Sequence, residues 1–512
     1  MDKRTMLAIA LSALVLIIFQ TFFAPETPVA DNESTQQEQT AQADNDAQPA
    51  EKHPAVEGSK PLKFNEATEP VKPQSTIEVK TADLLLTFNE TSGNILNAEI
   101  QQYNDKPIEI IFGNGIVDYM RAGIPVSTAY KGKKIETGDK TVLTFTAQQK
   151  DTLVTKRYEI EKNSYLIKAS VDITNSGDKS IEYPVDVQIG PGLGKGIEDS
   201  RYIFQGPMLF DGKKIRKEKA DDVDEPEVYS TPEWLGYTSK YFLFAALGDF
   251  ADGKLLKSGN SAVIKGSQRV IVNPDSRQSF EYDLYIGPKK YGVLKEIGSN
   301  LEKSINYGFF SFLAIPMLKL LNFVYDYVSN YGVAIIILTM IIKLITFPLT
   351  QKSMVSMKKM QKLQPKMQEL KEKYKDDKQK MNAAVMDLYK QEGANPFGGC
   401  LPIIVQIPVF FALYRTLLLS IELKGSPFIF HLTDLSLKDP YYITPILMGV
   451  TMFLQQRMSP QTGDPMQQKV FMLMPVIFTF LFLQFPSGLV IYWLTNNVLS
   501  IAQQYFINKK LD

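Results

Sequence analysis

The chain has 512 residues, enough for more than one domain, and its 56 basic and 56 acidic residues leave no formal net charge. A single cysteine excludes an intrachain disulfide framework, and two histidines leave little for metal binding or imidazole catalysis. Polar residues dominate roughly the first 300 positions, whereas the remainder holds nearly all the long apolar runs. We therefore expect a membrane-embedded part, and neither a metal site, a cofactor nor an enzymatic activity.

The first apolar run covers residues 5–24 and follows Lys3 and Arg4. At about 20 residues it can cross a bilayer, and the APETP that follows it is a poor signal-peptidase site. We predict an uncleaved transmembrane anchor over residues 1–24. Residues 25–75 are rich in Gln, Asp, Glu, Ala and Pro, a composition that cannot offset the entropy of ordering, so a flexible linker is expected there.

From residue 76 to about 287, apolar and polar residues alternate in short segments separated by turn-forming residues, as at 175–178. The clearest segments are TIEVK, ADLLLTF, NILNAEIQ, TVLTFTAQ, TLVTKRYEIE, SYLIKASVDIT, IEYPVDVQI and SFEYDLYIG. Many short strands without helical spacers are typical of a large antiparallel β-sandwich, which we predict over residues 76–300.

Residues 301–330 are apolar but interrupted by Pro316 and Lys319, which favours two short amphipathic helices at the membrane interface. The rest of the chain, 331–512, is predicted to be a helical membrane core. Its spans are expected at 331–349, 401–420, 441–458, 469–486 and 488–507, which with the anchor makes six.

Charge in the connecting segments predicts the orientation of these spans. Residues 350–400 hold eleven lysines and six acids, whereas residues 421–440 hold two lysines and three acids. Because positive loops stay in the cytoplasm, we expect both termini inside and the β-domain outside.

The span at 331–349 carries a lysine, Lys343, where a charge is costly and usually functional. Helical spacing places Thr339, Lys343, Thr346 and Thr350 on one face, which predicts a polar stripe lining a wet or protein-lined groove. In the alternative, the lysine stem snorkels to the membrane surface and the threonines are incidental. No Asp or Glu lies in any predicted span, Arg415 is expected to snorkel outward, and Tyr492, Asn496 and Gln503 share one face of the last span.

The segment 352–392 is predicted to be a cytoplasmic helical hairpin in which Pro365 kinks the first helix. Its apolar residues recur every three or four positions, and packing within the hairpin and binding of partners both remain open. The candidate contact residues are methionines, whose flexible side chains suit varied apolar partners. They are Met354, Met357, Met360 and Met367.

Five stretches resemble the YidC/Oxa/Alb family of membrane protein insertases, most closely its Gram-negative bacterial branch. They are KLITFPLT at 343–350, NPFGGCLP at 395–402, DPYYITPILMGVTMF at 439–453, DPMQQK at 464–469 and MPVIFTFLFLQFPSGLVIYW at 474–493. The resemblance implies an inner-membrane insertase and folding chaperone with five core helices around a hydrophilic half-membrane groove. It also implies an external sandwich similar to sugar mutarotases.

The same resemblance implies the groove residues. Lys343 matches the position of a groove arginine, Thr339 a groove threonine, and Tyr492 and Trp493 two aromatic positions. Helical spacing, not the resemblance, adds Thr346 and Asn496 to the candidate groove residues. Lysine lacks the planar fork of arginine, and Trp493 lacks the hydroxyl of the tyrosine common there. Implied partners are nascent membrane proteins, the Sec translocon and the lipid bilayer, with the ribosome and the signal recognition particle receptor as further candidates and no DNA.

Two other classes of function compete with insertion. One is a transporter or channel for an anionic substrate. A proton-coupled transporter usually carries intramembrane carboxylates or histidines, which these spans lack. The other is a mutarotase-like enzyme, but residues 76–287 contain no histidine for acid–base chemistry.

Overall fold

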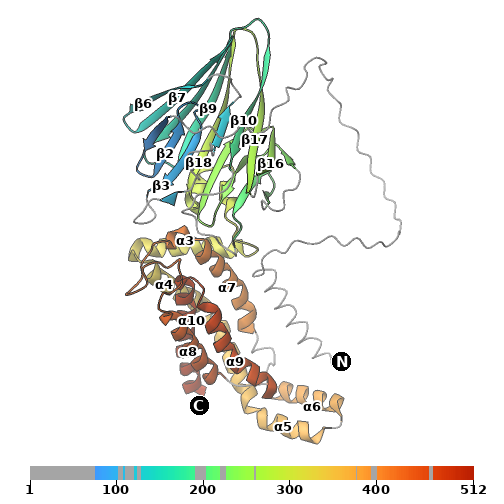
Figure 1. Ribbon diagram of the computed structural model, residues 1–512. Helices are drawn as coiled ribbons and strands as arrows, with labels where there is room; N and C mark the ends of the chain where they lie inside the picture. The colour runs from blue at the N-terminus through green and yellow to red at the C-terminus, as the bar shows by residue number, and fades with distance from the viewer. Residues whose placement is uncertain are drawn as a thin grey trace, which may run out of the picture.

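A computed structural model describes residues 75–101, 108–109, 120–123, 129–190, 203–218, 226–258, 261–375, 377–393, 401–459 and 465–511. The predicted anchor at 1–24 and residues 25–74 of the predicted linker lie outside these ranges. A β-sandwich occupies one end of the molecule and a group of long helices the other, with helix α3 lying across between them (Figure 1). The predicted division into a β-rich part and a helical part is therefore confirmed.

The β-sandwich consists of two nine-stranded sheets whose paired strands run antiparallel. The first contains, in spatial order, β1 (Thr76–Lys80), β2 (Leu84–Asn89), β3 (Ile95–Ile100), β5 (Met120–Gly123), β10 (Ile181–Ile189), β17 (Ser261–Val272), β16 (Asp252–Ser258) and β13 (Glu227–Ser230), with β4 (Ile108–Glu109) beside β3. The second contains β12 (Ile215–Lys217), β11 (Gly206–Phe210), β14 (Trp234–Thr238), β15 (Phe242–Gly248), β18 (Ser276–Pro288), β9 (Leu166–Asn175), β8 (Thr152–Glu161), β7 (Lys140–Gln149) and β6 (Lys131–Thr137).

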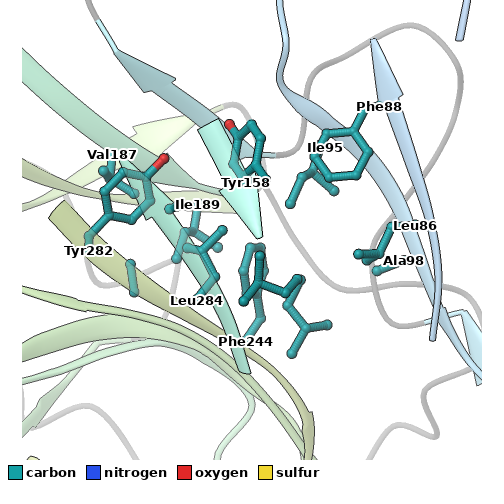
Figure 2. Packing of buried hydrophobic residues seen from close by; sticks show 14 of the residues in the cluster. Leu86, Phe88, Ile95, Ala98, Tyr158, Val187, Ile189, Phe244, Tyr282 and Leu284 are labelled. Carbon is teal, nitrogen blue, oxygen red and sulfur yellow. The ribbon is translucent and has the colours of Figure 1, made fainter. Parts of the chain in front are cut away.

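The two sheets bury one apolar core between them. Along β7 and β8 nearly every second residue is buried, as the period of two predicts. Phe88 of one sheet and Tyr158 of the other lie with ring centroids 5.1 Å apart, and Val187 and Ile189 lie near Tyr282 (Figure 2). The alternating segments of the sequence thus form strands that turn one face toward this core and the other face away from it.

Strands β14 and β15 have no alternating pattern, and the sequence interpretation missed them. Each of the five residues of β14 is buried, as are the first six of β15. Phe244 and Ala246 of β15 point into the sandwich core, whereas Leu243 and Ala245 belong to a second cluster that includes helical residues. A strand covered on both faces is apolar throughout, so its sequence cannot be told from a buried helical segment by periodicity.

We call that second cluster the shared core, because strands and helices both contribute to it. Its buried members are Met208, Phe210, Trp234, Leu243, Ala245, Leu247, Tyr285, Leu294, Leu301, Ile305, Tyr307, Ala314, Leu318, Ala412 and Leu419. The β-sandwich is therefore packed onto the helices and not merely connected to them by chain.

The helical part begins with α2 (Tyr291–Ile297) and a 3₁₀ turn at Leu301–Ser304. It continues with α3 (Ser311–Val328), α4 (Tyr331–Lys362), α5 (Gln364–Lys373), α6 (Lys378–Gln391), α7 (Leu401–Leu419), a 3₁₀ turn at Ile421–Leu423, α8 (Ile443–Met458), α9 (Pro465–Phe482) and α10 (Ser487–Leu511). Each of the five predicted spans within the described residues is helical over most of its length.

The prediction of two short interfacial helices before residue 330 is wrong in one respect, because α3 is a single helix of 18 residues. It continues through Pro316, which lies on its exposed face. The opposite face is buried against α4 and α7, and this packing holds the helix together despite the missing proline N–H. The exposed face also carries Phe312, Phe323 and Tyr327, which are 64%, 56% and 76% exposed.

The cytoplasmic hairpin also differs in detail from the prediction. Helix α4 runs unbroken to Lys362, well past the predicted end of its span, so only α5 and α6 form the hairpin. Pro365 does not kink a helix but stands in the first turn of α5, where its fixed φ and missing N–H are tolerated. Asp377 caps α6 by accepting the backbone N–H groups of Gln379 and Lys380 at 3.1 and 3.0 Å.

Among the described residues, α4 is the one helix both long and apolar enough to cross a bilayer by itself. Two shorter apolar helical stretches, Ile404–Leu419 and Met472–Phe482, lie in α7 and α9. The predicted count of six spans is not established by these helices.

Candidate functional site

Lys343 of α4 reaches sideways to α10. Its Nζ donates to Ser500 Oγ at 2.6 Å, and Ser500 Oγ donates in turn to the carbonyl oxygen of Asn496 at 2.7 Å. Among the described residues, Lys343 has no carboxylate within ion-pair distance. Because the ammonium points at a neighbouring helix, its direction differs from that of a lysine extended toward the end of its own helix.

A second contact joins the same two helices further along. Gln503 of α10 donates through Nε2 to Thr350 Oγ1 of α4 at 2.8 Å, and both side chains are buried. Gln503 Oε1 is buried without a hydrogen-bond partner in the described part of the chain. We call Lys343 and Thr350 of α4, with Ser500 and Gln503 of α10, the polar seam.

The opposite face of α4 is apolar and open. Leu344 and Ile345, next to Lys343 in sequence, are 72% and 73% exposed. In a membrane protein such a surface suits contact with lipid chains. Helix α4 therefore separates an apolar exposed face from a polar face turned toward α10.

The other predicted stripe residues make contacts within their own helix. Thr339 is buried, and its hydroxyl donates to the carbonyl oxygen of Ile335 at 2.6 Å. Thr346 is half-buried and donates to the carbonyl oxygen of Ile342 at 3.0 Å. These bonds satisfy the hydroxyl donors within α4, so neither hydroxyl group donates a hydrogen bond to another helix.

The two predicted aromatic residues, Tyr492 and Trp493, contact α7 and α9 and not Lys343. Tyr492 is buried, and its hydroxyl accepts a hydrogen bond from Gln406 Nε2 of α7 at 2.9 Å. Trp493 packs edge-on against Phe410 of α7 and Phe482 of α9, with centroid distances of 4.9 and 5.0 Å. Tyr492 and Trp493 thus tie α10 to α7 and α9.

The sequence interpretation missed Ser500 and Gln406. Ser500 lies four residues after Asn496 and eight after Tyr492, so the helical spacing that grouped Tyr492, Asn496 and Gln503 could have included it. Gln406 is a lone polar residue in an apolar run, and its spacing gave no signal.

The predicted hairpin methionines divide into two groups. Met360 is 7% exposed and forms a small core with Leu363, onto which Met357 packs. Met354 and Met367 are half-buried, and Met367 Sδ accepts a hydrogen bond from Tyr389 of α6 at 3.0 Å. Met360 therefore packs the end of α4 against the hairpin, whereas the other three retain some exposed surface.

The sandwich-side end of α4 is covered by the segment between α7 and α8. Asn330 caps α4, accepting the N–H of Val333 at 3.0 Å, and its Nδ2 donates to the carbonyl oxygen of Phe428 at 3.2 Å. A Cβ at Gly332 would lie 2.1 Å from the Phe428 ring, so glycine permits this close approach. Burial raises the pKa of Glu422 in the same segment. Helix α4 is thus tightly packed at its end toward the β-sandwich.

A buried lysine lies in the same region. Lys289, between the last strand and α2, donates through Nζ to Thr238 Oγ1 at 3.0 Å and to the carbonyl oxygen of Ser239 at 2.6 Å. Its burial lowers its pKa to about 7. These bonds attach the β14–β15 turn to the chain that leads into the helices.

Comparison with known proteins covers almost the whole chain. Residues 76–320 match the family described as the YidC periplasmic domain, and residues 323–512 match the family described as the 60Kd inner membrane protein. The membrane protein insertase YidC of Geobacter sulfurreducens is 40% identical over 539 aligned positions, covering 100% of this chain and 99% of the relative. That of Geotalea daltonii is 39% identical over 540 aligned positions and covers 100% of both chains.

Among solved structures, a crystal structure of an active YidC insertase with its first transmembrane domain resolved is 20% identical. The match covers 86% of this chain and 95% of that one, with a TM-score of 0.38.

Proposed function

The chain belongs to the YidC family of membrane protein insertases, and we propose that its polar seam lines the groove in which substrates are received. The protein inserts membrane proteins into the lipid bilayer. The observation that carries the proposal is the bond from Lys343 to Ser500, because it directs a cation into the helical part at a point where no described acid neutralises it.

The position of the cation suits a half-membrane groove. Lys343 lies twelve residues after the start of α4, about 18 Å along the helix at 1.5 Å per residue. The hydrocarbon core is about 30 Å thick, so the ammonium would lie past its middle, counted from the β-sandwich side. A polar tail drawn to this depth would have a shorter stretch of hydrocarbon left to cross.

The mechanism we propose makes and breaks no covalent bond. The ammonium transiently holds the polar, often acidic, outer tail of a substrate, while the substrate's apolar segment moves into lipid along the exposed face of the helices. Burial of that segment supplies the free energy, at about 25 cal/mol per Å². Packing of the 421–440 segment over α4 would keep the groove closed on the β-sandwich side.

The membrane arrangement is part of the same proposal. The lysine-rich segment that contains α5 and α6 would lie in the cytoplasm, with both termini, and the β-sandwich in the periplasm. The exposed aromatic face of α3 would then lie at the outer membrane interface. Six spans require the anchor at 5–24 and helices α4, α7, α8, α9 and α10. The Sec translocon, the ribosome and the signal recognition particle receptor are proposed partners.

Site-specific crosslinking during synthesis of a short membrane protein tests the groove. A photo-reactive residue in place of Thr346 or Asn496, both half-buried beside the polar seam, should crosslink to the nascent chain. The matched control is Ile345, which is 73% exposed on the opposite face of α4. Equal or stronger crosslinking of the substrate's polar outer tail from Ile345 would place the path of that tail outside the seam.

The hairpin is proposed to contact substrates before the seam does. Replacing Met354 and Met357 near the end of α4, together with Met367 of α5, by Ser should reduce crosslinks from this region to short nascent chains, because it removes adaptable apolar surface. The control is Met360→Leu, which keeps the volume of the buried position and should leave these crosslinks unchanged. Unchanged crosslinks in the triple variant would mean that these methionines serve packing alone.

Membership of the insertase family does not favour the alternative expectation, a transporter or channel for an anionic substrate. That alternative predicts movement of a small anion across vesicles containing the purified protein. Insertion of a membrane protein by the same vesicles in the absence of such movement favours the insertase mechanism.

A further inference from the structure

Arg415 is a charged residue near the β-sandwich end of α7, and its guanidinium has no ion-pair partner within the described part of the chain. It lies four residues before the helix ends at Leu419 and is half-buried. Among the described residues it has no hydrogen bond and no ion pair, although its neighbour Thr416 donates to the carbonyl oxygen of Ala314 in α3 at 3.1 Å. A guanidinium stays charged and carries five donors, so its surroundings should supply an anion.

The nearest acid along the chain does not serve as that anion. Glu422 is half-buried, and its carboxylate accepts a hydrogen bond from Asn322 of α3. The guanidinium instead lies beside the turn that leads into α3, where a Cβ on Gly308 would be 3.9 Å from Arg415 Nε. The backbone at Gly308 therefore lies next to Arg415, and no carboxylate of the described ranges pairs with it.

Aromatic side chains surround the same turn. Phe411, one helical turn before Arg415, stacks on Phe310 with a centroid distance of 6.2 Å. Phe309 and Phe312 on either side of Phe310 are 78% and 64% exposed. Exposed aromatic rings beside a basic residue at the end of an apolar helix are the arrangement found at the headgroup level of a membrane.

We propose that Arg415 binds the phosphate of a phospholipid headgroup on the β-sandwich side of the membrane, with Phe309 and Phe312 resting among the adjoining acyl chains. A phosphodiester offers two oxygens that match the fork of a guanidinium. The binding would hold the start of α3, and through it the shared core, at a fixed depth in the membrane. The proposal is separate from the polar seam, which lies deeper along α4.

Thermal stability of the purified full chain in detergent tests this site. Adding a short-chain phosphatidylglycerol should raise the unfolding midpoint of the native protein by a few degrees, because a ligand that binds the folded state stabilises it. Arg415→Gln should lose most of this shift and Arg415→Lys should keep part of it. Lys319→Gln, which changes an exposed lysine of α3, should keep all of it.

Two further arms distinguish the sources of phosphate and guard against misfolding. Inorganic phosphate at the same concentration should give little shift, and a full shift with it would overturn the assignment to lipid. Native mass spectrometry of the Lys variant should show fewer retained phosphatidylglycerol molecules than the native protein. An equal lipid-induced shift in native protein and the Gln variant would overturn the proposal.

Discussion

Lys343→Ala is expected to impair insertion of substrates whose short outer tails carry Asp or Glu, and to spare those with neutral tails. The reason is that the ammonium at the polar seam attracts carboxylates and has no described acid of its own. The Ala variant should discriminate between the two kinds of substrate by about 1 to 3 kcal/mol, because a hydrated groove screens the ion pair more than dry lipid would. Lys343→Arg should insert both substrates, since it keeps the charge.

The measurement is insertion of paired substrates that differ only in tail charge, in membranes carrying each variant at equal amounts. Leu344→Ala is the matched control, because Leu344 is the next residue of α4 and faces away from the seam. If the Ala variant of Lys343 inserts both substrates equally well, the lysine is a snorkelling residue and the groove proposal loses its cation.

Gly449→Ala is expected to lower the stability of the helical part by about 1 to 3 kcal/mol through overpacking. A Cβ at this position of α8 would lie 2.0 Å from Thr479 Oγ1 of α9, and that hydroxyl is held by a hydrogen bond to the carbonyl oxygen of Pro475 at 2.7 Å. Small residues let helices in a membrane approach closely. The helices must therefore separate, or Thr479 must give up its bond.

A second substitution identifies the contact responsible. Thr479→Ala in the Gly449→Ala background removes the hydroxyl, leaving the Thr479 Cβ position at 3.1 Å, and should recover part of the stability. The readout is the temperature at which heated samples lose their monodisperse peak in detergent. Val450→Ala, at an exposed position, should change little. A Gly449→Ala protein as stable as its parent would contradict the close packing of α8 on α9.

The sequence predicted the elements that have one face in the core and one outside it. The alternating segments became strands because their side chains sort between the sandwich interior and solvent, as along β7. The five apolar runs after residue 330 became helices because their length leaves little alternative. By contrast, β14 and β15 were missed because burial on both sides erases the pattern, and Pro316 was read as a break although packing carries α3 through it.

The sequence predicted only part of the candidate site. Helical spacing placed Lys343 and Thr350 on one face, and the structure turns both toward α10. It could not give their partners, because Ser500 lies 157 residues away from Lys343 in sequence. Nor could spacing show that Thr339 bonds within its own helix, or that Tyr492 turns toward Gln406. Pairings between distant segments depend on the packing of whole helices.

The shared core has a consequence for how the molecule loses its structure. Strand β15 contributes Phe244 to the sandwich interior and Leu243 to the cluster that contains Ala314 and Leu318 of α3. Unfolding of the sandwich would therefore expose the apolar residues of α3 to solvent. Detachment of α3 would likewise expose the outer face of β15. The two halves should accordingly unfold in a single cooperative transition, and proteases should find no early cleavage site between residues 289 and 310.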